Sequence, residues 1–184
     1  MQFDRFDIPD LVLVTPKRIG DERGWFSEVF REDLFRAQAG GVSFVQHNQS
    51  YSRPKGTVRG LHFQLEPKAQ GKLVRCTRGA VLDVAVDLRS SSPTFGQHVA
   101  VELSAENGRQ VWIPAGFAHG FCTLTEDCEL AYMVTDYYSA PHDRGVLWND
   151  PDLAIAWPVT DADAILSDKD RRQPRLRDLG PVFA

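Results

Sequence analysis

The feature of this sequence that most restricts its fold is a series of short runs rich in valine and aromatic residues, each bounded by turn-forming residues. β-Branched and aromatic residues favour extended strands, and many short strands with few helical patterns are typical of a sandwich or barrel. We therefore expect an all-β, double-stranded β-helix (jelly roll), which encloses a cavity between two sheets. The runs are "LVLV" from residue 11, "VSFVQHNQSYS" from 42, "TVRGLHFQL" from 57, "KLVRCTRGAVLDVAVDLR" from 72, "QHVAVELS" from 97, "RQVWIP" from 109 and "ELAYMVTDYYS" from 129.

Two glycine-containing dipeptides predict how some of these strands are joined. We interpret "KLVRCTRGAVLDVAVDL" as a hairpin that turns at Arg78-Gly79, and "LSAENGRQVWIP" as a hairpin that turns at Asn107-Gly108. Asn-Gly is the strongest short-range hairpin signal. We expect the strands on either side of each turn to pair in the antiparallel sense.

Helical patterns are scarce. Residues 31–40, "REDLFRAQAG", have helical spacing with Leu34 and Phe35 apolar, and glycines at 40 and 41 end the pattern. This predicts a short surface helix, and any other helices should be few, short and peripheral. From about residue 149 the chain is rich in Pro and Asp and poor in strand pattern, so we interpret residues 149–184 as a tail packed on the barrel.

Length and composition indicate one globular domain over residues 1–184, since the chain is long enough for one substantial core and short for two. Hydrophobic residues make up 42% and charged residues 25%, which argues against disorder and against a membrane protein. The formal net charge is −4 and the isoelectric point about 5.7, so a nucleic-acid partner is not expected.

The cysteines and the N-terminus favour a cytoplasmic location. Cys76, Cys122 and Cys128 are odd in number and form no C-x-x-C pair, which fits reduced thiols. Cys76 and Cys122 lie in apolar strand-like runs, where a free cysteine usually behaves as a small buried hydrophobic residue. The opening "MQFDRFDIPD" has neither a basic nor an apolar signal region, and no run of 18 apolar residues occurs.

Polar residues inside the strand-like runs are candidates for a functional site, because small barrels place polar side chains inside only where they line a ligand cavity. Each one alone could equally lie on an outward strand face or form a satisfied polar group in the core. Their number on successive strands favours a cavity. They are Gln46, Asn48, Arg59, His62, Gln64, Lys72, Arg75, Asp83, His119 and Tyr132.

Two segments carry histidines in recognisable motifs. "WIPAGFAHGF" contains P-x-G-x-x-H, which ends at His119, and "GLHFQLE" contains His62. The first of these segments is similar to the second motif of the cupin jelly rolls, and "GLHFQLE" occupies the place of the first cupin motif. Metal-binding cupins have H-x-H in that first motif, whereas here the second histidine is replaced by Gln64. Glutamine is a poor ligand for transition metals. We therefore expect no metal, and we assign His62 to proton transfer.

A more specific resemblance extends over nearly the whole chain. The segments that carry it are "GDERGWFSEVF" (20–30), "FVQHNQS" (44–50), "RGLHFQ" (59–64), "QGKLVRCTRGAVLDVAVDLR" (70–89), "SPTFG" (92–96), "WIPAGFAHGF" (112–121), "YYS" (137–139), "LWND" (147–150) and "LSDKD" (166–170). In these segments the sequence is similar to the dTDP-4-dehydrorhamnose 3,5-epimerase family, and the resemblance implies a metal-free, cofactor-free and usually homodimeric cupin. It implies inversion of carbons 3 and 5 of dTDP-4-keto-6-deoxy-D-glucose to give dTDP-4-keto-L-rhamnose.

The resemblance also implies four catalytic residues. His62 is the expected base, and a carboxylate on its far ring nitrogen would fix the tautomer and stabilise the imidazolium. The family motif favours Asp170 for that carboxylate, with Asp168 as the competitor. Lys72 is the cation expected to stabilise the enolate oxygen, and Tyr132 is the acid on the opposite face, unless it is an aromatic residue of the barrel core.

Further positions match residues that contact the substrate in the family. Arg23 and Arg59 match diphosphate contacts, because a guanidinium fork pairs two oxygens at once. Phe26 and Tyr138 are candidates for stacking on thymine, with core packing as the alternative, and Trp25 stands before Phe26 where other aromatics can occur. The other positions that match are Glu28, Gln46, Asn48, His119, Asp143 and Lys169.

Strict strand alternation places Arg59 and His62 on opposite faces, although the resemblance implies that both face the cavity. A glycine in a strand often marks a bulge, so we expect Gly60 to re-aim its neighbours. Three rival functions fit the same residues: a related mono-epimerase or ketoisomerase, a metal-dependent cupin oxygenase, and a non-catalytic sugar-binding jelly roll.

Overall fold

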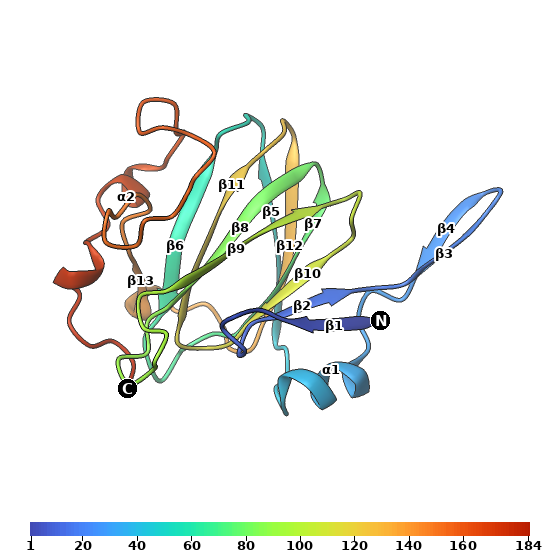
Figure 1. Cartoon of the computed structure of the whole chain (residues 1–184), viewed down its shortest axis with the longest axis horizontal. Helices are drawn as coiled ribbons and strands as arrows, with labels where there is room; N and C mark the ends of the chain where they lie inside the picture. Colours follow the sequence, from blue (N-terminus) through green and yellow to red (C-terminus); the bar gives the residue numbers. More distant parts are fainter.

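Two antiparallel sheets lie face to face in the computed structural model, which describes residues 1–184 (Figure 1). The strands are β1 (Gln2–Arg5), β2 (Val12–Thr15), β3 (Arg18–Asp21), β4 (Gly24–Ser27), β5 (Gln46–Ser52), β6 (Val58–Gln64), β7 (Lys72–Arg78), β8 (Ala80–Asp87), β9 (His98–Ser104), β10 (Gln110–Ile113), β11 (Phe117–Thr123), β12 (Cys128–Val134) and β13 (Asp143–Gly145). One sheet has the order β1-β2-β10-β7-β12-β5 and the other β13-β6-β11-β8-β9. The all-β prediction is confirmed.

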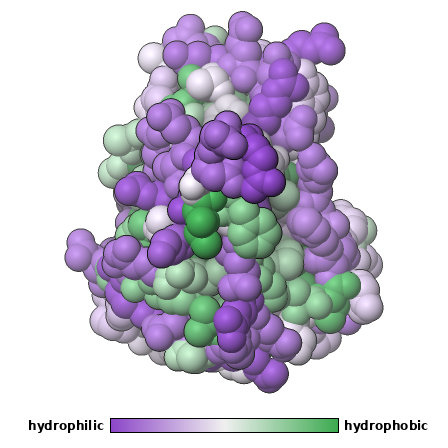
Figure 2. Space-filling model, turned by 90° about the vertical axis from the view of Figure 1, so that its right-hand side faces the viewer, coloured by the Kyte–Doolittle hydropathy of each residue, from purple (hydrophilic) through white to green (hydrophobic).

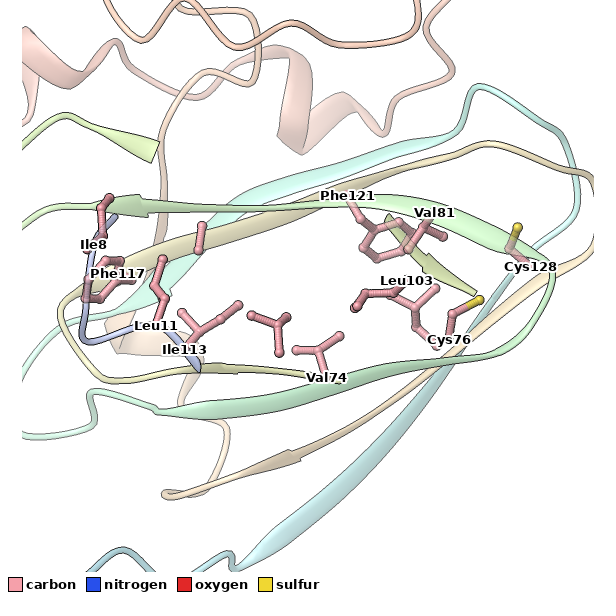
Figure 3. Packing of buried hydrophobic residues seen from close by; sticks show 13 residues of the cluster. Ile8, Leu11, Val74, Cys76, Val81, Leu103, Ile113, Phe117, Phe121 and Cys128 are labelled. Atoms are coloured by element: carbon pink, nitrogen blue, oxygen red, sulfur yellow. The ribbon is translucent and has the colours of Figure 1, made fainter. Parts of the chain in front are cut away.

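The main hydrophobic core fills the space between the two sheets (Figure 3). Val74 on β7 and Leu130 on β12 belong to one sheet, and Val81 on β8 and Phe121 on β11 belong to the other. Successive residues of a strand point to opposite faces, so every second residue of these strands enters the core. Burial of this apolar surface is the main favourable contribution to folding, at roughly 25 cal/mol per Å².

The two predicted turns are present, but the predicted hairpins are wrong. Gly79 and Gly108 both have positive φ, as tight turns require. At Gly79, however, the chain passes from β7 in the six-stranded sheet to β8 in the five-stranded sheet, and at Gly108 it passes back from β9 to β10. The strands on either side of each turn therefore belong to opposite sheets. Their apolar side chains meet in the core between the two sheets.

Short helices and irregular segments cover the outer faces of the sheets. The helices are α1 (Glu32–Ala39), η1 (Ala140–His142), α2 (Asp168–Arg171) and η2 (Leu176–Asp178). The predicted helix is confirmed as α1, whose Phe35 packs against Trp112 on the outside of the six-stranded sheet. None of the helices has the length and apolar character that crossing a membrane requires.

The C-terminal segment packs on the outside of the five-stranded sheet (Figure 1). Trp157, Leu179 and Phe183 contact the cluster that contains Leu61 and Phe63 of β6. These contacts cover the outer face of the strand that carries His62. That residues 1–184 form a single domain stays a prediction.

The β3–β4 hairpin projects away from the sheets (Figure 1). Figure 2 looks onto the side from which it projects, and this face is mainly hydrophilic with small groups of hydrophobic residues. The hairpin itself is unusually apolar for an exposed element, since Ile19, Trp25 and Phe26 are 61%, 57% and 70% exposed. Arg18 lies over the Trp25 ring at 4.1 Å.

The three cysteines are buried and free. The burial predicted for Cys76 and Cys122 is confirmed. Burial raises the pKa of the Cys76 and Cys122 thiols to about 11. A thiol with such a pKa is a poor nucleophile at neutral pH. We assign the cysteines no chemistry.

Candidate active site

Two adjoining chambers of 540 and 500 Å³ lie between the sheets along β5 and β6. Four side chains line both chambers: His62, Lys72, Tyr132 and Lys169. His62 belongs to the five-stranded sheet, whereas Lys72 and Tyr132 belong to the six-stranded sheet. The ionisable groups therefore meet at the wall that the two chambers share.

The sequence of β5 makes one side of this cavity polar. Gln46, Asn48, Ser50 and Ser52 alternate along the strand and are partly or fully buried, and the residues between them are more exposed. The first two line the second chamber and the last two line the first chamber. Strand alternation thus places a row of hydrogen-bonding side chains in the cavity.

Gly60 allows both Arg59 and His62 to line the first chamber. Its φ is +124°, and a Cβ atom there would lie 2.5 Å from the nearest backbone atom of β11. The pairing register between β6 and β11 shifts opposite this point. The predicted bulge is therefore confirmed, and only glycine fits it because the two backbones approach so closely.

His62 is paired with Asp170 from α2. The His62 Nε2 and Asp170 Oδ1 atoms are 2.5 Å apart, and the side chains are 31% and 5% exposed. Ser167 donates a second hydrogen bond to Asp170 Oδ2 at 2.9 Å. Burial raises the pKa of Asp170, but the hydrogen bonds from His62 and Ser167 and nearby positive charge outweigh it, so the pKa lies below its ordinary value. Asp168 is exposed, and Asp170 is the aspartate of this helix that contacts His62.

His119, which lines the first chamber, belongs to a second histidine–aspartate pair. His119 Nε2 on β11 is 2.9 Å from Asp83 Oδ2 on β8, and both side chains are buried. The sequence marked Asp83 as polar but assigned it no role. The missing signal was the register between β8 and β11. In that register Asp83 is directly opposite Phe121, so it is a diagonal neighbour of His119 on the same face of the sheet.

Lys72 crosses the cavity from the six-stranded sheet. It is 8% exposed, and its Nζ donates to the backbone carbonyl of His62 at 3.2 Å. Burial lowers the pKa of Lys72 to about 8, and Lys169 lowers it too, while Asp83 and Asp143 oppose the shift. The ammonium group is thus poorly solvated, and a negative charge that forms next to it would be strongly attracted.

Tyr132 is the aromatic residue at the wall shared by the chambers. Burial raises its pKa, which the charge of Arg59 partly opposes, so the phenol holds its proton firmly at neutral pH. The ring packs at the edge of the main core, as the core interpretation of Tyr132 predicts. The side chain also lines the cavity, as its interpretation as the acid requires. Its hydroxyl end is the polar part of a side chain that lines both chambers.

The second chamber contains half of the ten predicted substrate contacts. Gln46, Asn48, Tyr138, Asp143 and Lys169 line it. The Gln46 Nε2 atom donates to Asn48 Oδ1 at 2.8 Å. Asp143 Oδ2 accepts from the Tyr138 hydroxyl at 3.2 Å and from Lys169 Nζ.

Arg59 is held at the rim of the first chamber. Its Nε donates to Ser52 Oγ at 3.0 Å and its Nη2 donates to the Tyr51 carbonyl at 3.0 Å. The remaining N–H groups of the guanidinium are free to bind an anion.

Three predicted contacts do not line either chamber. Arg23 is at the tip of the β3–β4 hairpin, where its side chain is 85% exposed and pairs with Asp21. Phe26 is on β4, and Glu28 follows it. The hairpin points away from the sheets, so these residues cannot reach the cavity of their own chain in this arrangement (Figure 1).

No group of three His, Cys, Asp or Glu side chains is arranged to hold a metal ion. The two cavity histidines direct their Nε2 atoms at carboxylates. Gln64 has its side chain in hydrogen bonds to the backbone of other segments.

The fold and the cavity define the class of protein: a cupin-like jelly roll with a histidine-lined polar site between its sheets. Comparison with known proteins then gives the family. The family model described as dTDP-4-dehydrorhamnose 3,5-epimerase matches residues 5–178. A dTDP-4-dehydrorhamnose 3,5-epimerase of Sinorhizobium fredii is 57% identical over 183 residues, which cover 100% of this chain and 93% of the relative. The chain belongs to the dTDP-4-dehydrorhamnose 3,5-epimerase family.

Solved structures agree with this assignment. A dTDP-6-deoxy-D-glucose-3,5-epimerase of Legionella pneumophila in complex with dTDP-4-keto-L-rhamnose has a TM-score of 0.92 and 45% identity, over 97% of this chain and 94% of that chain. A 3'-monoepimerase of Streptomyces bikiniensis in complex with dTDP-quinovose has a TM-score of 0.89 and 37% identity, over 98% of this chain and 92% of that chain. The same fold therefore supports both double and single epimerisation.

Proposed function

We propose that this protein inverts carbons 3 and 5 of dTDP-4-keto-6-deoxy-D-glucose to give dTDP-4-keto-L-rhamnose. The single observation that carries the proposal is the wall shared by the two chambers. There, His62 with its partner Asp170 comes from one sheet, and Lys72 and Tyr132 come from the other. Epimerisation beside a ketone needs a base, a group that stabilises the enolate oxygen, and an acid on the opposite face.

His62 acts as the base. Neutral imidazole removes the proton from the carbon next to the ketone, and the carbon–hydrogen electron pair moves into the enolate. Asp170 stabilises the imidazolium that forms, because its buried carboxylate accepts from the ring at 2.5 Å. The lowered pKa of Asp170 keeps this carboxylate ionised at neutral pH.

Lys72 stabilises the enolate. The ketone carries no net charge before proton removal, so an ammonium group beside its oxygen acts mainly on the state in which charge has developed. The buried position of Lys72 strengthens that interaction, since little water competes for the oxygen.

Tyr132 supplies the proton on the other face. Its phenol is on β12 in the six-stranded sheet, across the cavity from His62 on β6. Donation from the phenol to the enolate carbon inverts the centre, and solvent then returns a proton to Tyr132 while His62 releases the one it accepted. The same pair can act on carbon 3 and carbon 5, since both are next to the ketone.

The nucleotide half of the substrate is bound by polar groups around the reactive wall. Arg59 has free N–H groups at the rim for the diphosphate, and Gln46, Asn48 and Tyr138 line the second chamber. Lys169 lines both chambers and supplies a further cation. No cofactor is needed for this chemistry.

We also propose that the protein acts as a homodimer in which the β3–β4 hairpin of each protomer reaches the cavity of the other. The hairpin exposes Ile19, Trp25 and Phe26 to solvent, and such an apolar projection is typical of an interface. In this arrangement Arg23, Phe26 and Glu28 complete the partner's nucleotide site.

Product formation tests the proposed function. Purified protein is incubated with dTDP-4-keto-6-deoxy-D-glucose, the product is identified by proton NMR, and His62→Ala is the matched variant. We expect wild-type turnover and a variant that still binds dTDP but has lost about 10² to 10⁴-fold in kcat. Absence of turnover by the folded wild-type protein would contradict the proposal.

One alternative is favoured by a specific observation. The Streptomyces bikiniensis 3'-monoepimerase shares the fold at a TM-score of 0.89. A mono-epimerase would give product inverted at one carbon, and the same NMR spectra distinguish it.

A further inference from the structure

The segment of residues 136–139 joins β12 to η1 and bears Tyr138 at the mouth of the second chamber. None of its N–H groups donates to a backbone carbonyl. In place of a sheet partner, its backbone is bound by side chains that come from other parts of the chain. Backbone polar groups need partners, so these side chains determine where the segment lies.

Three glutamines supply most of those bonds. Gln70 Nε2 donates to the Asp136 carbonyl at 2.7 Å, and Gln46 Oε1 accepts from the Tyr138 N–H at 3.0 Å. Gln64 makes two bonds to the segment: its Nε2 donates to the Tyr137 carbonyl at 3.2 Å, and its Oε1 accepts from the Ser139 N–H at 2.7 Å. Gln64 therefore holds the backbone on both sides of Tyr138.

The amide of Gln64 has no donor hydrogen left for a ligand. Its second Nε2 hydrogen is donated to the Lys68 carbonyl at 2.6 Å, and the residue is only 4% exposed. A primary amide has two donor hydrogens, and both are used here. The position that a metal ligand occupies in other cupins thus serves a different purpose in this chain.

We propose that Gln64 is a positioning residue that fixes the 136–139 segment, so that Tyr138 forms a wall of the second chamber against the nucleotide part of the substrate. The inference rests on the proposed function, since it takes a dTDP-linked sugar as the ligand. Tyr138 is 60% exposed, and its hydroxyl contacts Asp143 at 3.2 Å, so little besides its own backbone holds the ring. Gln64 therefore acts on substrate binding and leaves the proton transfers unchanged.

Gln64→Met tests this inference, because methionine has a similar volume and no hydrogen-bonding amide. The matched control is Gln49→Met on β5, since Gln49 is exposed and its side chain donates to the Glu129 carboxylate and not to the 136–139 segment. We expect amide hydrogen exchange in residues 136–139 to accelerate in Gln64→Met and not in the control. We expect the Kd for dTDP and the KM to rise roughly tenfold with kcat nearly unchanged, which corresponds to one or two lost hydrogen bonds.

A double-mutant cycle shows whether Gln64 acts through Tyr138. If it does, Gln64→Met combined with Tyr138→Ala binds dTDP no more weakly than Tyr138→Ala alone. The inference would be overturned if the two substitutions lowered dTDP affinity by factors that multiply in the double variant. Unchanged amide exchange and unchanged dTDP affinity in a folded Gln64→Met protein would overturn it as well. If circular dichroism shows that Gln64→Met does not fold, Gln64→Glu is used instead, because it keeps an acceptor for the Ser139 N–H and loses the donor to the Tyr137 carbonyl. Unchanged amide exchange and unchanged dTDP affinity in that variant would overturn the inference.

The readouts separate this inference from the proposed function. Hydrogen exchange and dTDP binding report on the segment without any turnover. A wild-type protein that binds dTDP but makes no product contradicts the proposed function alone. Normal turnover with an unchanged KM in the Gln64→Met protein contradicts the positioning role alone.

Discussion

His62 and Asp170 are 108 positions apart in the chain, yet their side chains meet at 2.5 Å between His62 Nε2 and Asp170 Oδ1. The contact forms because α2 packs against β6, and because Asp170 is held from its other side by Ser167. A buried carboxylate that faces an imidazole at the edge of a cavity favours proton transfer by that imidazole.

Asp170→Asn is expected to lower kcat by about 10² to 10⁴-fold, because an amide neither stabilises the imidazolium nor keeps the required tautomer. The Kd for dTDP should stay nearly unchanged, since the Asp170 carboxylate is bound to His62 and Ser167 and to none of the residues proposed to bind the nucleotide. Asp168→Asn is the control on the same helix, and its side chain is exposed. Steady-state kinetics and calorimetry measure both quantities. Equal activity in Asp170→Asn and wild type would remove the pair from the mechanism.

The lowered pKa of Lys72, about 8, predicts an alkaline limb in the pH profile of kcat. The ammonium form stabilises the enolate, so activity should fall by about tenfold for each pH unit above that pKa in the enzyme–substrate complex. Lys72→Arg keeps its charge at every accessible pH and should shift the limb upward, although its overall rate should be lower. An identical limb in wild type and Lys72→Arg would assign the titration to another group.

Tyr132→Phe separates the acid from a simple core residue. The substitution keeps the ring and nearly the same volume, so the free energy of unfolding should change by less than about 1.5 kcal/mol. His62 can still remove the substrate proton, so solvent exchange into recovered substrate should continue while inverted product forms much more slowly. Proton NMR in D₂O follows both. Product formation at the wild-type rate would show that the acid is another residue or water.

Subunit complementation tests the placement of Arg23 in the partner's cavity. His62→Ala and Arg23→Ala proteins are assayed separately at low substrate, then mixed under conditions that exchange subunits. In a mixed dimer, one cavity has His62 from one protomer and Arg23 from the other, so random exchange should restore about a quarter of wild-type activity. If Arg23 serves its own protomer, both cavities stay defective and mixing restores nothing.

Much of the architecture could be predicted from the sequence, because the local composition of a segment indicates whether it forms a strand. The helix at residues 32–39 and the bulge at Gly60 were also predicted from local sequence signals. The hairpins at Gly79 and Gly108 were predicted wrongly, because a turn dipeptide fixes the direction of the backbone but not the sheet that the next strand joins. Partner choice depends on which apolar faces meet across the core, which is a property of the whole chain.

In the candidate site, too, local features could be predicted from the sequence, and features that depend on the whole fold could not. The polar residues of β5 could be placed in the cavity by strand alternation, whereas the Asp83–His119 contact depends on the register between β8 and β11. Motif resemblance suggested Arg23, but it could not show that the β3–β4 hairpin extends away from its own cavity. The sequence also gave no role to Gln64, because its partners are backbone groups of a distant segment.

The most direct test of the central claim is solvent deuterium incorporation in D₂O, read at each sugar carbon by proton NMR, with and without a metal chelator. If His62 and Tyr132 act from opposite walls without a metal, carbons 3 and 5 of the product should both carry deuterium and both be inverted, at equal rates in the two samples. Deuterium at neither carbon, or activity that chelation removes and a divalent ion restores, would contradict the account.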